Sequence, residues 1–126
     1  IENAKLLFEC VGKITHINEK DIDIFTALIG SGPAYIFYLI ESLLDSSKNL
    51  HLPEQEKKDL LASMISGAAN LVLNSDESPN VLRKKVTSPG GVTQTAIEEF
   101  ETEGLKEILS KSMIAAEKKS IELGED

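Results

Sequence analysis

The sequence holds little of the material that disulfides, metal sites and nucleic-acid interfaces require. It contains one cysteine, Cys10, so it cannot form an internal disulfide, and we expect it in a reducing, cytoplasmic compartment. The two histidines, His16 and His51, stand far apart and predict no metal site. Acidic residues outnumber basic ones 21 to 13, and the formal charge of −8 argues against a nucleic-acid partner.

The sequence also shows no pattern typical of a membrane segment or of a nucleotide-binding motif. We find no apolar run near the roughly 20 residues that cross a bilayer, and we expect no secretory signal and no membrane partner. There is no P-loop, and Gly30-Ser31-Gly32-Pro33 is too short for a dinucleotide fingerprint. Acidic pairs such as Glu98-Glu99 fall on the outer face of a predicted helix, where solvation accounts for them.

A single segment has the pattern of a strand. Residues 13–17 alternate polar and apolar side chains and are rich in β-branched residues. One strand is not stable without a sheet, and no second strand is predicted. The helix expected before it ends near Cys10 and Gly12. Because the chain also begins with Ile1 rather than Met, we expect these first residues to belong to a domain that continues outside this sequence.

The rest of the chain is predicted to be helical. With 41% apolar residues it can fold as one domain. Proline suits the first turn of a helix and glycine the turn that follows one, so both mark the boundaries. The expected helices cover residues 21–29 behind an Asn18 cap, 33 to about 48, the segment that Pro53 opens, 79–86, 92–103, and the segment from Leu105 to Leu123 after a turn at Gly104.

The helix that starts at Pro33 is apolar on nearly every side. A helix of this kind is buried all round, and the remaining helices offer limited material to cover it. We therefore expect a partner chain to cover it. Its apolar residues are Tyr35, Ile36, Phe37, Tyr38, Leu39, Ile40, Leu43 and Leu44.

The segment Val86-Thr87-Ser88-Pro89-Gly90-Gly91-Val92-Thr93 is the best candidate for a binding site. Glycine lets the backbone bend through positive φ, and the first amides of the helix that follows have no partner within it. Such a junction can hold an anion, and we expect a small carboxylate with hydroxyl contacts from Ser88 and Thr93. The alternative is an ordinary proline-glycine turn between two helices. The chain offers no evident general base, which suits a reaction whose chemistry a cofactor carries.

Three motifs together resemble the pyrroline-5-carboxylate reductase family. They are Thr26-Ala27-Leu28-Ile29-Gly30-Ser31-Gly32-Pro33-Ala34-Tyr35, then Gly67-Ala68-Ala69, then the segment 86–93. Their order and spacing match the C-terminal half of that family, and the resemblance runs through essentially the whole chain. Ile29 stands where the family often has serine, and Val92 where threonine or alanine is common.

The resemblance implies a mainly α fold, a helical dimerisation domain of the 6-phosphogluconate dehydrogenase C-terminal-like type. Residues 1–17 would be the helix and strand left from an N-terminal NAD(P)-binding Rossmann domain. Residues 18–126 would be the helical dimerisation and substrate-binding domain, intertwined with a second subunit.

The resemblance also implies an activity: NAD(P)H-dependent reduction of 1-pyrroline-5-carboxylate to L-proline, the last step of proline biosynthesis. NADPH or NADH would be bound mainly by the absent domain; its contacts in this chain are unknown, and Gly30, Ser31 and Gly32 are the candidates. Thr93 would hydrogen-bond the ring nitrogen and is the catalytic candidate. The fragment alone is expected to be inactive. The substrate carboxylate would be held by Thr87, Ser88, Pro89, Gly90, Gly91, Val92 and Thr93.

Two other functions stay open at this point. The chain can be a helical dimerisation module with no catalytic role, or part of a reductase of another cyclic imine. The sequence does not determine the choice between NADPH and NADH, the oligomer beyond a dimer, the ring size of the substrate or the proton donor.

Overall fold

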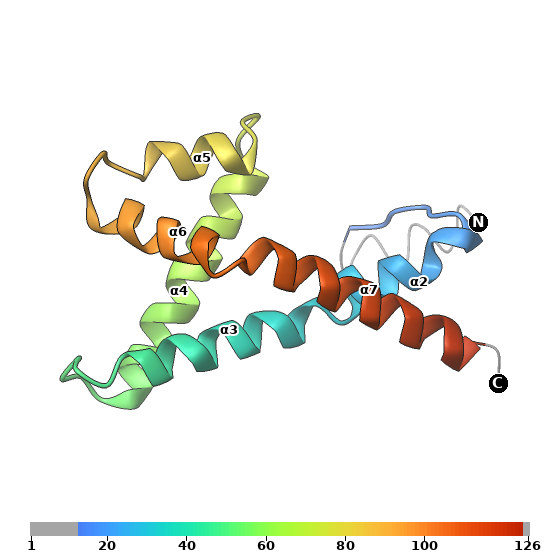
Figure 1. Cartoon of the computed structure of the whole chain (residues 1–126), viewed down its shortest axis with the longest axis horizontal. Helices are drawn as coiled ribbons and strands as arrows, with labels where there is room; N and C mark the ends of the chain where they lie inside the picture. The colour runs from blue at the N-terminus through green and yellow to red at the C-terminus, as the bar shows by residue number, and fades with distance from the viewer. Residues whose placement is uncertain (1–12, 125–126) are drawn as a thin grey trace.

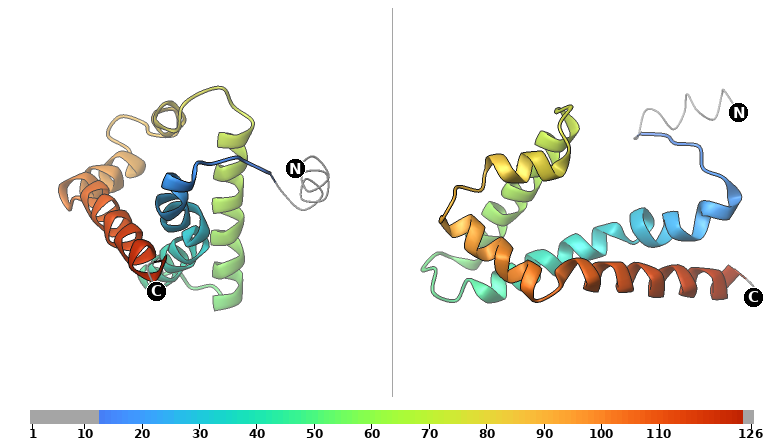
Figure 2. Two further views of the ribbon diagram at one scale, coloured as in Figure 1. Left: turned by 90° about the vertical axis from the view of Figure 1, so that its right-hand side faces the viewer. Right: turned by 45° about the horizontal axis from the view of Figure 1, so that its top comes forward.

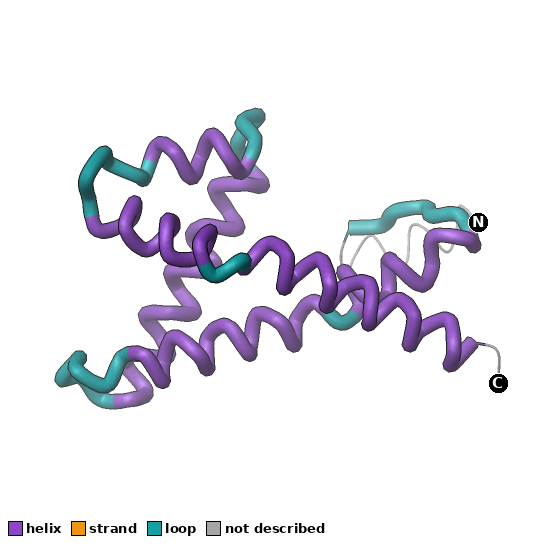
Figure 3. The backbone as a smooth tube through the Cα atoms, in the orientation of Figure 1, coloured by secondary structure: helices purple, strands orange, loops and turns teal. Residues whose placement is uncertain are grey.

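The computed structural model describes residues 13–124, and every regular element in this range is helical (Figure 3). The mainly α fold predicted from the sequence is therefore confirmed. In chain order the elements are η1 (Glu19–Asp21), α2 (Ile22–Phe25), η2 (Thr26–Gly30), α3 (Gly32–Ser46), α4 (Glu54–Leu73), α5 (Pro79–Lys85), α6 (Val92–Thr102) and α7 (Leu105–Gly124).

Proline and glycine set the helix boundaries as predicted. Pro33 and Pro79 lie in the first turns of α3 and α5, where the missing N–H has no intrahelical partner to lose. Pro53 directly precedes α4. Gly104 has a φ of 71° and makes the turn between α6 and α7, a conformation that residues with a Cβ rarely adopt.

The strand predicted at residues 13–17 does not form. Residues 13–18 have no regular secondary structure. A strand needs a neighbour for its backbone hydrogen bonds, and the described part of the chain provides none. The helix expected before it lies outside the described residues. The assignment of residues 1–17 to a Rossmann domain stays a prediction.

The helix predicted at residues 21–29 forms, but its hydrogen bonding changes along its length. It begins as the 3₁₀ turn η1, where the Asp21 amide donates to the Asn18 carbonyl at 2.9 Å. Asn18 precedes the helix as expected, although its side chain donates to the Asp21 carboxylate and makes no cap bond to the backbone. The segment ends in the π turn η2, where the Ser31 amide donates to the Thr26 carbonyl at 2.9 Å.

Packing within the chain centres on this N-terminal helical segment. Helix α7 lies beside α2 and η2, as Figures 1 and 2 show, and the Ser120 hydroxyl donates to the Asp23 carboxylate at 2.7 Å. The Tyr35 hydroxyl, from α3, donates to the Ala27 carbonyl in η2 at 2.8 Å. Ala27 is 2% exposed and is the one buried residue among those described. The remaining contacts, α3 with α4 and α6 with α7, leave an open frame of helices.

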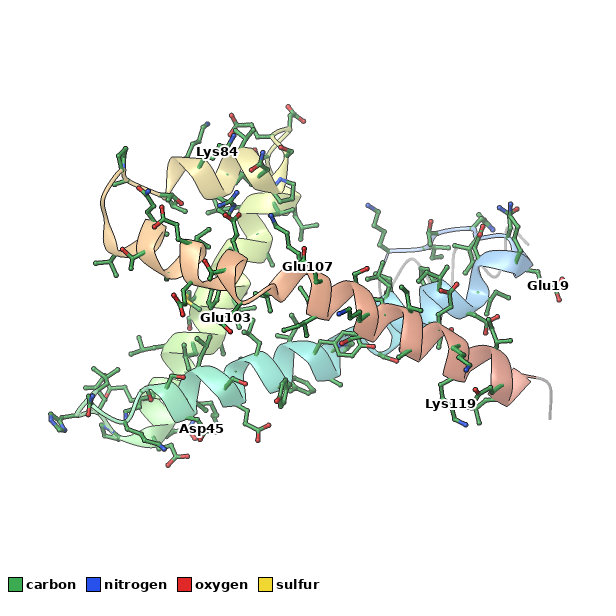
Figure 4. All side chains as sticks on the ribbon, viewed as in Figure 1. Glu19, Asp45, Lys84, Glu103, Glu107 and Lys119 are labelled. Atoms are coloured by element: carbon green, nitrogen blue, oxygen red, sulfur yellow. The ribbon has the colours of Figure 1, made fainter. Side chains whose placement is uncertain are left out.

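Much apolar surface is left uncovered by this frame. Helix α3 contains no buried residue, and Phe37 and Tyr38 are 68% and 71% exposed. Figure 4 shows side chains projecting from α3 without meeting another helix along much of its length. The predicted apolar helix therefore forms, but its own chain does not bury it.

One expectation about membranes needs correction. The segment Glu19–Ser46 is long and apolar enough to cross a bilayer by length and composition, with a mean hydropathy of 1.4 and 6% of the apolar window buried. The sequence had suggested a break at Gly30-Ser31-Gly32, whereas the helical path continues through the π turn. Length and composition alone are weak evidence, because a helix that a second subunit covers has the same properties.

The contact between Tyr35 and η2 generates a test of the fold. Tyr35→Phe should lower the free energy of unfolding by about 1 kcal/mol, because the Ala27 carbonyl loses its hydrogen-bond donor. Chemical denaturation measures the change. Tyr38→Phe is the control, since its hydroxyl donates no hydrogen bond within residues 13–124. Equal effects of the two substitutions would show that the bond to Ala27 contributes nothing.

Candidate functional site

The candidate binding segment, residues 87–93, is the loop between α5 and α6 (Figure 1). Its centre is a tight turn, in which the Gly91 amide donates to the Ser88 carbonyl at 3.0 Å. Proline fixes a negative φ at the second position of this turn, and Gly90 has a φ of 69° at the third. This combination defines a type II turn, which explains why glycine stands at position 90.

The second glycine avoids a close contact with Ser88. A Cβ built on Gly91 would lie 3.1 Å from the Ser88 carbonyl oxygen and 3.4 Å from the Ser88 Cβ. Gly91 also occupies the N-cap position of α6, with an extended backbone and no side chain to cap the helix. The turn therefore leads directly into α6, and no side chain caps the first backbone amides of that helix.

The first turn of α6 presents unused hydrogen-bond donors. Within the part of the chain that the structure describes, the backbone amides of Val92, Thr93 and Gln94 donate to no protein acceptor, and the first intrahelical bond at this end is from Thr95 to Gly91. The Ser88 and Thr93 side chains are exposed. Free amides at the positive end of a helix dipole suit a small anion.

The predicted loop residues differ in what they can offer a ligand. The Thr87 hydroxyl is half-buried and donates to the Arg83 carbonyl at 2.7 Å, so its proton serves the end of α5. The Val92 side chain is 90% exposed and presents apolar surface to solvent. Thr93 lies on the first turn of α6, beside the free amides. These placements are compatible with the predicted roles, which stay predictions.

Positive charge precedes the loop. The last turn of α5 carries Arg83, Lys84 and Lys85. Lys85 pairs with the Glu77 carboxylate at 2.6 Å, an exposed pair of modest energy, and Arg83 donates to the Asn80 side chain at 3.2 Å. Figure 4 shows Lys84 pointing outward from α5. These cations stabilise the carboxyl end of α5 and add to the positive character of the region.

The sequence analysis does not predict that Gln94 contacts the loop or that Glu98 holds the Gln94 side chain. The Gly90 amide donates to Gln94 Oε1 at 2.8 Å, and Gln94 Nε2 donates to Glu98 Oε1 at 2.6 Å. Glu98 is exposed, as the predicted solvated acidic face requires, but it also orients Gln94. The signal was present: glutamine at the third helical position is the place from which a side chain reaches back to a preceding amide, and Gln94 and Glu98 are four residues apart.

The structure does not bring the two predicted ligand-binding segments together. Gly30, Ser31 and Gly32 lie where η2 meets α3, beside α7, whereas the loop 87–93 lies at the other end of the frame (Figure 1). Hollows of about 220 and 290 Å³ lie around the turn between α3 and α4, away from both segments. A site that used both segments would need a second subunit or a further domain.

No three histidine, cysteine, aspartate or glutamate side chains within residues 13–124 are grouped so that they could hold a metal ion. His16 and His51 are both exposed.

The positive φ of Gly90 predicts that a side chain is unfavourable at this position of the turn. Gly90→Ala should lower the free energy of unfolding by about 1–2 kcal/mol, because a Cβ is strained at a φ of 69° even though space is available. Gly32→Ala is the control, since it has no positive φ and no atom within 4 Å of the added Cβ. Denaturation curves that show no loss for Gly90→Ala would contradict the type II turn.

Comparison with known proteins identifies the family of this chain. Residues 19–123 match the family model described as pyrroline-5-carboxylate reductase dimerisation. The chain is 35% identical over 123 residues to pyrroline-5-carboxylate reductase 1 of Bacillus subtilis, covering 98% of this chain and 41% of that protein. It is 41% identical over 120 residues to pyrroline-5-carboxylate reductase of Arabidopsis thaliana, covering 95% of this chain and 44% of the relative.

Solved structures agree with the sequence relatives. The structure of a pyrroline-5-carboxylate reductase from Coxiella burnetii superimposes with a TM-score of 0.88 at 36% identity, over 97% of this chain and 46% of that one. The Plasmodium falciparum pyrroline carboxylate reductase, solved with NADP bound, gives a TM-score of 0.87 at 34% identity, over 94% of this chain and 48% of that one. The chain spans less than half the length of these relatives. It belongs to the pyrroline-5-carboxylate reductase family and corresponds to the dimerisation domain of that family.

Proposed function

We propose that this chain is the C-terminal part of an NAD(P)H-dependent reductase that converts 1-pyrroline-5-carboxylate to L-proline. In this proposal it supplies the subunit interface and the loop that holds the substrate carboxylate. The match of residues 19–123 to the dimerisation domain of such reductases carries the proposal. The three unused amides at the start of α6 support the role of the loop.

The substrate role follows from the chemistry of the loop. The substrate carboxylate would accept hydrogen bonds from the amides of Val92, Thr93 and Gln94, at the positive end of the α6 dipole. The Thr93 hydroxyl would hydrogen-bond the ring nitrogen. Holding both groups fixes the orientation of the ring, and orientation supplies a large part of the rate in reactions of this kind. A proton would reach the nitrogen from solvent or through Thr93.

The cofactor would depend on residues outside the described range. NADPH or NADH supplies the hydride in the proposed reaction, but residues 13–124 contain no strand, glycine loop and helix arranged to hold a dinucleotide. Gly30, Ser31 and Gly32 could provide no more than a peripheral contact. Because residues 13–124 do not provide this arrangement, we expect this part of the protein to be inactive by itself.

The second proposed role is to form the subunit interface. Helix α3 exposes Phe37 and Tyr38 by 68% and 71%, and a second copy of the chain would cover this apolar face. A module that only dimerises would need this interface and no ligand at the loop. Ligand binding at the loop therefore separates the reductase from the purely structural alternative.

Turnover by the complete protein tests the reductase proposal. Oxidation of NADPH that depends on 1-pyrroline-5-carboxylate is the expected result. A folded dimer without turnover would support another cyclic imine as substrate or a structural role, and homologous six-membered imines with the same carboxylate would distinguish those two.

The role of Thr93 predicts a specific loss of activity. In the complete enzyme, Thr93→Val should lower kcat/KM about tenfold, because one hydrogen bond to the reacting nitrogen is lost. Thr95→Val is the matched control: it lies one half-turn further along α6, and its hydroxyl makes a single long bond of 3.3 Å to the Gly91 carbonyl. Unchanged kinetics for Thr93→Val would remove Thr93 from the mechanism.

The interface proposal predicts the effect of a charge on α3. Phe37→Glu should convert the dimer to monomers at micromolar concentration, because a carboxylate would be buried without a partner. Light scattering measures the mass. Asp45→Asn, at the exposed end of α3 (Figure 4), should leave the mass unchanged. A Phe37→Glu variant that stays dimeric would place the interface elsewhere.

A further inference from the structure

The peptide between Pro89 and Gly90 is held in one orientation by a side chain of α6. Its N–H, from Gly90, donates to Gln94 Oε1 at 2.8 Å. In a planar trans peptide the N–H and C=O point in opposite directions. Because the N–H is directed toward the first turn of α6, the Pro89 carbonyl is directed away from it.

The backbone alone does not select this orientation. Type I and type II turns differ mainly by a flip of their central peptide, proline suits the second position of both, and glycine at the third position accepts either sign of φ. A flip to type I would turn the Pro89 carbonyl toward the place where the Gly90 N–H now lies. That oxygen carries negative charge and would lie beside the amides that are free to bind an anion.

Glu98 determines the orientation of the Gln94 side-chain amide. The side-chain amide of glutamine has one accepting and one donating end, whereas a carboxylate only accepts. Because Glu98 Oε1 accepts from Gln94 Nε2 at 2.6 Å, the Gln94 oxygen must face Gly90. The bond involves a charged acceptor, which makes it one of the stronger kinds of hydrogen bond.

We infer that Gln94, oriented by Glu98, is a positioning residue that keeps the 88–91 turn in its type II form and so keeps the Pro89 carbonyl out of the carboxylate site. It acts through the turn and does not contribute to the chemical step. The inference rests on the proposed function, because it assigns the loop to the substrate carboxylate.

Kinetics of the complete reductase test this inference. Gln94→Ala should raise KM for 1-pyrroline-5-carboxylate about fivefold with little change in kcat, since one hydrogen bond stabilises the binding form of the turn. Glu98→Ala should act in the same direction with a smaller effect. Glu98→Gln should keep KM near that of the parent, because the new amide oxygen still accepts from Gln94. Glu99→Ala, on the same helix without a side-chain hydrogen bond in residues 13–124, is the control.

The double variant separates positioning from independent effects. If Glu98 acts only through Gln94, the Gln94→Ala/Glu98→Ala variant should have the KM of Gln94→Ala alone. Additive effects would overturn the inference, as would an unchanged KM in Gln94→Ala, an equal loss in kcat, or a Glu98→Gln variant as poor as Glu98→Ala.

An NMR measurement tests the turn independently of activity. In protein labelled at proline and glycine, the contact between Pro89 Hα and the Gly90 amide proton is strong in a type II turn and weak in type I. The signal should be strong in the parent and in Glu98→Gln, and should weaken in Gln94→Ala. An equally strong signal in Gln94→Ala would overturn the inference. If the parent shows this signal but no turnover, the proposed substrate is wrong, and the same comparison still decides the role of Gln94 in the turn.

Discussion

The helices of a single chain bury almost no hydrophobic core among residues 13–124, and the rest of the structure depends on this constraint. Ala27 is the one buried residue in the described range, and α3 leaves the side chains of Phe37 and Tyr38 in solvent. Residue 27 lies where α2, η2 and α7 meet, which is the best-packed part of the frame. A second subunit is the natural source of the missing cover, in agreement with the match to a dimerisation domain.

The candidate site, like α3, is exposed on the surface of the single chain. The loop 87–93 leads to three backbone amides at the start of α6 that have no acceptor within residues 13–124. Its geometry is nevertheless well specified, because Pro89 and Gly90 set the turn, Gly91 permits the close approach to Ser88, and Gln94 holds the central peptide. In the proposed function the loop orients a carboxylate, and a partner subunit or a further domain would supply the remaining surfaces of the site.

The features predicted correctly from the sequence are those that depend on neighbouring residues. Pro33 and Pro79 fixed helix starts because the restriction lies in the residue itself. The strand at residues 13–17 failed because it needs a partner strand, which sequence alone does not supply. Gln94 was missed because its role arises from the turn it reaches back to. The separation of residues 30–32 from the loop is a tertiary property that no local pattern reports.

The central claim is that the amides at the start of α6 bind the carboxylate of a cyclic amino acid. Titration of the ¹⁵N-labelled complete protein with L-proline, followed by NMR, tests it most directly. We predict that the amide signals of Val92, Thr93 and Gln94 shift on addition of L-proline and not on addition of pyrrolidine, which lacks the carboxylate. Signals that stay unchanged with L-proline, or shift equally with pyrrolidine, would contradict the account.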